Sequence, residues 1–375
     1  MTQFFKTHPK KAWLALFLLV VGLALILFTA HDQFLYRQPI GRVLTVKETS
    51  RHKRTDEFKN VDYQMTQKLT VKVMNGRYKG KIVQVHNRYS ASGALDQHYR
   101  VGQEGFLSQI NHDRHGYSAS LNGLKRDTIL VFLLWLALSA LILLLGSAGA
   151  RAALSVVLNF GLILGAISVN LRLQASHVVL IFSLLAVIFT IVTLLLVFGA
   201  NLQSLLAMVA TLLSTFVSLG ICLVVMALTN QKGIYYESMQ YVTQNPRTLF
   251  IAEILLGSLG AVMDESSDVV ATVFELKRVD QRAGFKKLFK AGMQVGKSVM
   301  GPLINVLLLI FFASTFTCAL LYLKNGNSWG YTFDMSMCLG MVQSLAAGIG
   351  IVINVPLIST LIAYVLKGSD ESVND

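Results

Sequence analysis

Charged residues are scarce in this chain: they make up 14% of its 375 residues, whereas hydrophobic residues make up 54%. Soluble globular domains carry about 25% charged residues, so the composition argues against that class. The mean hydropathy of +0.56 indicates a polytopic membrane protein instead.

Cysteine is also scarce. The three cysteines, Cys222, Cys318 and Cys338, all lie in or beside apolar runs, so we expect no disulfide framework. No Cys/His spacing is typical of a zinc site. The chain lacks a Walker A loop, a G-x-S-x-G motif and an H-E-x-x-H motif. We therefore expect no enzymatic activity, no cofactor and no resident metal.

Long apolar runs are what the chain does contain, and eight of them are long enough to cross a bilayer. They lie at about 12–30, 128–147, 152–170, 178–200, 202–229, 249–276, 298–323 and 338–366. The first follows three lysines but is too long for the apolar region of a cleaved signal peptide, so we expect a retained anchor. The predicted fold is a polytopic α-helical membrane protein of about eight transmembrane helices.

The orientation follows from lysine and arginine in the short loops. Basic residues gather before the first span and in the linker at 277–297, and an eight-span chain puts both on the cytoplasmic side. We expect an anchor with a cytoplasmic N-terminus at 1–30, an extracytoplasmic domain at 31–127, a bundle of about seven helices at 128–367 and a cytoplasmic tail at 368–375. The linker alternates basic and apolar residues, which favours an amphipathic helix at the membrane surface.

The extracytoplasmic region is predicted to be β-rich. Residues 67–74 alternate polar and apolar side chains, the turn signal Asn75-Gly76 follows, and a second strand-like run begins at Lys81. A small barrel of OB or SH3 type fits this length. Residues 31–127 carry a net charge of +8, which favours anionic lipid headgroups or an anionic wall polymer as a partner. Nucleic acid is not an expected partner outside the membrane.

The sixth apolar run carries carboxylates, which are costly in a membrane and mark functional sites. On a helix, Glu253, Asp264, Asp268 and Glu275 fall within an arc of about 60°, and Glu265 points elsewhere. None of the expected spans contains lysine or arginine. We therefore expect the acidic face to turn into the bundle or a wet cavity, where its carboxylates take up a proton or a cation. Structural hydrogen bonding between helices is the alternative.

Other polar and helix-breaking residues lie in the later spans. Gly257 and Gly260 are near the acidic face, and the sequence does not decide whether the 249–276 helix is continuous or broken. Two further segments join a proline to a nearby asparagine, Pro302 with Asn305 and Pro356 with Asn354. Proline frees a backbone carbonyl, which must face protein or a cavity. These groups are candidate ligands or gating points, and ordinary kinks are the alternative.

Four segments are similar to the YibE/F family of bacterial membrane proteins: GSLGAVMDESSDVVATVFEL (257–276), GKSVMGPLINVLLLI (296–310), GIGIVINVPLISTLIA (348–363) and VKVMNGRYKGKIVQVHN (71–87). Asp264 and Glu275 fall at the family's acidic positions. Glu265 and Asp268 stand where such proteins usually have small apolar residues. The resemblance implies a multi-pass protein of the bacterial plasma membrane, with a shorter YibF-like subunit or a homo-oligomer as partner.

Two functional hypotheses remain open on the sequence. The first is a secondary transporter coupled to a proton or cation, with Asp264 and Asp268 at the ion site and an unknown substrate. The alternative is a non-transporting envelope assembly or scaffold protein, whose basic external domain binds an anionic wall polymer or a partner protein.

Overall fold

The computed structural model describes residues 9–57, 59–93, 96–113, 116–174, 176–239 and 245–371. They form two compact units, one ending at Gly149 and the other beginning at Ala150. Among these residues, eight helices are long and apolar enough to cross a membrane. The predicted fold class is thereby confirmed, with the β-rich domain inserted after the first helix.

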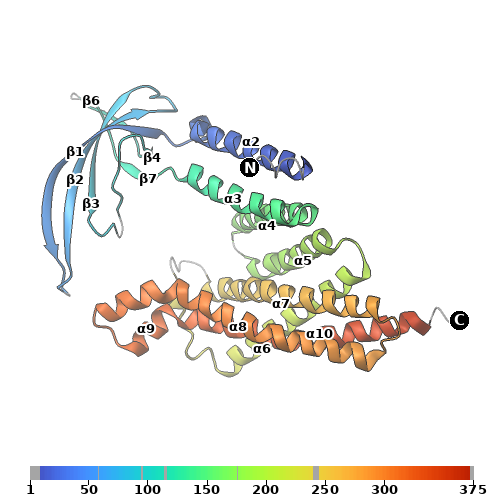
Figure 1. The fold of residues 1–375 in the computed structure, drawn as a ribbon. Helices are drawn as coiled ribbons and strands as arrows, with labels where there is room; N and C mark the ends of the chain where they lie inside the picture. Colours follow the sequence, from blue (N-terminus) through green and yellow to red (C-terminus); the bar gives the residue numbers. More distant parts are fainter. Residues whose placement is uncertain are drawn as a thin grey trace. The chain divides into compact units, whose positions relative to one another are not determined.

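The first unit joins a helical pair to a sheet (Figure 1). Its elements are α2 (Pro9–Ala30), η1 (Asp32–Leu35), β1 (Ile40–Thr55), β2 (Val61–Val73), β3 (Ile82–Ser90), β4 (Glu104–Leu107), β5 (Asn111–Asp113), β6 (Gly116–Ala119), β7 (Leu121–Leu124) and α3 (Asp127–Leu145). Helices α2 and α3 lie side by side, and the Trp135 indole donates a hydrogen bond to the carbonyl of Leu18 at 3.0 Å.

The seven strands form one sheet in the order β5-β6-β3-β2-β1-β4-β7, an open half-barrel. The period-two pattern of β2 buries Leu69, Val71 and Val73 on one face, against Val83 and Val85 of β3. The hairpin predicted around Asn75-Gly76 is present, because β2 and β3 pair antiparallel across this turn.

Asn75 does more than mark the turn. Its side-chain oxygen accepts a hydrogen bond from the backbone N–H of Ile40 at 2.6 Å. Its amide nitrogen donates to the carbonyls of Tyr36 at 2.9 Å and Gln38 at 3.1 Å. The turn thus fixes the start of β1, while Gly76 takes the φ of +73° that a side chain would disfavour.

Asn75→Ala is expected to destabilise the sheet by about 1–3 kcal/mol, because it leaves the buried N–H of Ile40 without an acceptor. Hydrogen exchange of the β1 and β2 amides in the full chain measures this loss. Gln84→Ala, on the exposed side of β3, is the matched control. Equal exchange in both variants would contradict the structural role of Asn75.

The second unit is helical. Its elements are α4 (Ser147–Arg172), α5 (Val178–Phe198), α6 (Leu202–Leu228), η2 (Tyr236–Ser238), α7 (Pro246–Val279), α8 (Phe285–Lys324), α9 (Trp329–Ser336) and α10 (Cys338–Glu371). Helix α7 packs against α5, α6, α8 and α10, and α10 also packs against α6 and α8. Helices α7, α8 and α10 lie side by side in the lower part of Figure 1.

The basic linker differs from the expectation. Helix α7 continues to Val279 and α8 already begins at Phe285, so residues 285–297 are the first turns of α8 and not a separate surface helix. Leu288 is fully buried, and Gly292 and Gly296 lie directly against Ser359 and Val355 of α10. Residues 285–297 therefore pack against α10 as part of α8, whereas their amphipathic pattern alone favoured a position at the membrane surface.

Gly296→Leu is expected to cost about 1–3 kcal/mol, because any side chain there overlaps the Val355 side chain. Thermal unfolding in detergent, followed by a thiol-reactive dye at the buried Cys222 and Cys338, measures the effect. Gly301→Leu is the control, since open space surrounds Gly301 on the same helix. Equal unfolding temperatures would show that α8 and α10 do not meet at Gly296.

Candidate functional site

Helix α7 crosses the centre of the second unit as one continuous helix. Pro246 stands at its first turn, and Lys277 and Arg278 stand in its last turn, both favourable positions for those residue types. The question of a break at 264–268 is therefore answered: the helix passes through this segment unbroken.

Four carboxylates share one side of α7, as expected, but this side does not turn into the helix bundle; Glu253 alone among them lines the pocket formed with α8 and α10. Glu253, Asp264, Asp268 and Glu275 all lie exposed on the surface of the unit. Glu265, which points about 90° away from the centre of that face, is fully buried. The apolar side of α7 packs against its neighbouring helices, so this packing carries Glu265 inward and turns the other four carboxylates outward.

Glu265 lies in a polar cluster built by α6, α7 and α10. The side-chain oxygen of Asn354 on α10 accepts hydrogen bonds from the hydroxyls of Ser214 on α6 and Ser266 on α7, each at 3.1 Å. The Asn354 side chain also lies beside the Glu265 carboxyl. All four side chains are fully buried. One asparagine therefore links the three helices beside the carboxyl group.

Several buried polar atoms of α6, α7 and α10 have no hydrogen-bond partner among the described residues. They are both carboxyl oxygens of Glu265, the amide nitrogen of Asn354 and the hydroxyls of Thr211, Thr215 and Ser359. Buried polar groups are normally paired, so each unpaired one calls for an explanation. No described lysine, arginine or histidine forms an ion pair with Glu265. This set of groups suits a proton on the carboxyl or a small cation among oxygen ligands.

The structure separates the other candidate residues. Only Asn354 joins Glu265. Asn305 and Pro302 lie exposed on α8, Pro356 is exposed on α10, and both helices run continuously through their prolines. Of the two glycines on α7, Gly260 faces open space and Gly257 faces the Gln343 side chain.

The hydroxyl groups of α6 were missed by the sequence analysis. Thr211, Ser214, Thr215 and Ser218 are all fully buried, and the Ser218 hydroxyl donates to the carbonyl of Ala346 on α10. Their spacing of three, one and three residues places them on one helical face. That spacing is visible in the sequence and marks a polar inner face of the fifth span.

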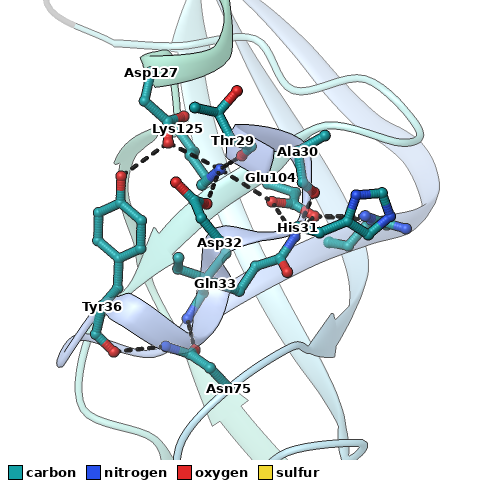
Figure 2. Close-up of polar contacts among 12 residues, drawn as sticks. Thr29, Ala30, His31, Asp32, Gln33, Tyr36, Asn75, Glu104, Lys125 and Asp127 are labelled. Carbon is teal, nitrogen blue, oxygen red and sulfur yellow. Dashed lines mark hydrogen bonds and ion pairs between the residues drawn. The ribbon is translucent and has the colours of Figure 1, made fainter. Parts of the chain in front are cut away.

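A second polar cluster lies in the first unit, where η1, β4 and β7 meet the helical pair (Figure 2). The ammonium group of Lys125 lies 2.7 Å from Asp32 and 3.0 Å from Asp127, and it donates to the carbonyl of Thr29. Its side chain is only 3% exposed. The Tyr36 hydroxyl donates to Asp127 at 2.9 Å. The cluster ties the end of α2 to the start of α3.

Glu104 extends this cluster to the sheet. Its carboxylate accepts from the Gln33 amide at 2.9 Å and from the Arg42 guanidinium at 2.7 Å. Burial acts against the charge of Lys125, but its hydrogen bonds to Asp32 and Asp127 and their charges outweigh that effect, so the pKa of Lys125 is raised. Burial and the bond to Asp127 raise the pKa of Tyr36 to about 12. Lys125 thus stays charged, which indicates that the cluster is a structural joint between α2, the sheet and α3.

Neither cluster is a metal centre by its ligands. Among the described residues, no three histidine, cysteine, aspartate or glutamate side chains are close enough to hold a metal ion together. The Glu265 cluster offers one carboxylate, one amide and several hydroxyls, which is the chemistry of proton or monovalent cation binding.

The two clusters and the apolar helices define a multi-pass membrane protein with an N-terminal β-rich domain. Residues 133–368 match the model of the YibE/F-like protein family, and residues 34–124 match the model of the YibE/F family N-terminal domain. The chain therefore belongs to the YibE/F family. No curated protein and no solved structure matches it.

Proposed function

We propose that this protein is a secondary transporter coupled to a proton or a monovalent cation, and that Glu265 is the coupling group. The observation that supports this proposal is a fully buried carboxyl group in a membrane-spanning helix, without a basic partner among the described residues. A charge in that place is costly, so binding a proton or a cation stabilises the site. The proposal moves the ion site from Asp264 and Asp268 to the neighbouring face of the helix, about 90° around its axis.

The surrounding groups support reversible binding. Two hydroxyls already donate to the Asn354 oxygen, and the Asn354 amide nitrogen stands beside the carboxyl of Glu265. The amide can donate to an ionised carboxylate, and the hydroxyls of Ser214 and Ser266, which meet at Asn354, offer lone pairs to a cation. Because the groups come from three helices, a change in charge at Glu265 alters the contacts between α6, α7 and α10. Such a link between ion binding and helix packing is what coupled transport requires.

The proposal includes an orientation. We place the protein in a bacterial plasma membrane with both termini in the cytoplasm and residues 31–127 outside. The basic residues at 277–297 support this orientation, since positive residues in short loops stay cytoplasmic. The proposal assigns no enzymatic activity to the chain. A shorter YibF-like subunit is proposed to cover the exposed carboxylates of α7, which are costly against lipid.

One observation favours the scaffold alternative. Strands β1 and β2 form a hairpin, and at its outer end residues 50–55 of β1 pair only with residues 61–66 of β2. There the guanidinium carbon of Arg51 lies 4.2 Å from the centre of the Tyr63 ring. Together with the net charge of +8 in residues 31–127, this arm offers a surface for an anionic wall polymer.

Proteoliposomes that contain the purified chain and a pH-sensitive dye test the proposal. Imposed proton, sodium and potassium gradients are applied in separate experiments, and protein-free liposomes are the control. Flux above the control under one gradient supports the transporter and identifies the coupling ion. Background flux under all three gradients, together with binding of an anionic polymer to the external domain, would favour the scaffold.

A further inference from the structure

A second polar feature of the helical unit lies near the N-terminal end of α7, away from Glu265. There α7, α8 and α10 line a half-open cavity of about 370 Å³. Small-molecule sites in proteins span about 300–1,000 Å³, so this volume suits a small ligand. Its polar lining consists of Glu253, Ser314, Thr315, Gln343 and Ser344, and Phe311 lines it with an aromatic ring.

The polar groups of this cavity are mostly acceptors. The hydroxyls of Ser314 and Thr315 donate back to the carbonyl of Phe311 at 2.8 Å and 3.0 Å, so they present lone pairs to the cavity. The amide nitrogen of Gln343 donates to the backbone carbonyl of Glu253 at 3.4 Å. A ligand that supplies donors therefore matches this lining.

The charge of the lining points the same way. Glu253 forms no ion pair with any described basic residue, and the apolar stretches of α7, α8 and α10 contain no lysine or arginine. A carboxylate at the membrane favours a positive ligand, because a nearby cation offsets its loss of hydration. The face of the Phe311 ring also attracts cations.

We propose that this cavity binds a small organic cation that carries a protonated primary amine. The ammonium group pairs with Glu253 and donates to the hydroxyls, and its short carbon chain lies on Phe311. The proposal rests on the transporter function above and names the class of its substrate.

The cavity and the Glu265 cluster are separate sites. Glu253 and Glu265 are twelve residues apart on one helix, or about 18 Å along its axis. The apolar cluster of Ala261, Ala347 and Ile351 packs against Leu303 and Leu307 of α8, and Ala347 and Leu307 also line the cavity. The amine and the coupling ion thus occupy different sites that share α7 and α10.

Binding of matched four-carbon probes to the purified full chain tests the proposal. Calorimetry with n-butylamine at neutral pH is expected to show saturable binding, whereas 1-butanol and butyrate, which lack the ammonium group, show none. Glu253→Gln is expected to weaken amine binding at least tenfold. Glu275→Gln, on the same exposed face but outside this cavity, is the control and keeps wild-type affinity.

A second variant guards against an effect on folding. Ser314→Leu fills the cavity from α8 and is expected to weaken binding as well. Equal binding of butylamine and butanol, or wild-type affinity in Glu253→Gln, would overturn the proposal. Glu253-dependent binding in a chain without gradient-driven flux would support the cavity and overturn the transporter. Gradient-driven flux without amine binding would support the transporter and overturn the proposed amine site.

Discussion

Glu265→Gln is expected to reduce gradient-driven flux to the level of protein-free liposomes. Glutamine has nearly the shape of glutamate and fits beside Asn354, but it neither takes up a proton nor carries a charge. The flux assay in liposomes measures this loss directly. Size-exclusion profiles and thermal unfolding of the variant in detergent report whether the fold is kept, and we expect both to match the wild type.

The acidic face of α7 provides the matched control for this prediction. Asp264→Asn is the same chemical change one residue away, on the exposed side of the helix. We expect it to keep most of the flux, because its carboxyl does not reach the polar cluster of α6 and α10. Loss of flux in Asp264→Asn with normal flux in Glu265→Gln would return the ion site to the exposed face.

Lys125→Met is expected to destabilise the first unit by about 3–5 kcal/mol, the usual cost of breaking a buried ion pair. The substitution leaves Asp32 and Asp127 facing each other without a cation. Hydrogen exchange of the β1 and β4 amides in the full chain measures the change. The exposed Lys68→Met, on β2, is the control and is expected to change stability by less than about 0.5 kcal/mol.

A compensating variant separates charge from packing at Lys125. Lys125→Met combined with Asp32→Asn and Asp127→Asn removes the uncompensated charges and is expected to recover part of the lost stability. If the triple variant is no more stable than Lys125→Met, the lysine stabilises the joint by packing rather than by charge.

The Lys125 cluster also sets a pH dependence. The pKa of Lys125 is raised above its ordinary value of 10.5, so the folded state holds this proton more tightly than the unfolded state. Its contribution to stability is therefore complete below about pH 10.5 and is lost as the pH rises through the folded pKa. Between pH 5 and pH 9 the contribution of Lys125 is therefore expected to be constant.

Much of the architecture follows from local sequence. Each of the eight apolar runs became a long helix, because a span needs only enough consecutive apolar residues. The alternation at residues 67–74 and the turn at Asn75-Gly76 produced the expected hairpin. These features depend on neighbours in the sequence, so the sequence is enough to predict them.

The polar core was harder to predict because its parts are distant in the chain. Asn354 meets Ser214 and Ser266 across separations of 140 and 88 residues. The cluster at Lys125 likewise joins residues about 90 positions apart, from Asp32 to Asp127. No local sequence pattern predicts such pairs, although the spacing of the hydroxyl residues in α6 indicates which face of that helix is polar.

The sequence by itself determined the number of long apolar helices, the hairpin of the N-terminal β-rich domain and the single acidic face of α7. Only the tertiary structure decided which side of α7 faces inward. In water, hydrophobicity decides which side chains of a protein lie inside and which lie outside. A lipid tail is as apolar as a protein interior, so in a membrane an apolar helix face need not point to lipid. Close packing of α7 against α6 and α10 settled the matter, and it placed Glu265 in the core and Asp264 on the surface.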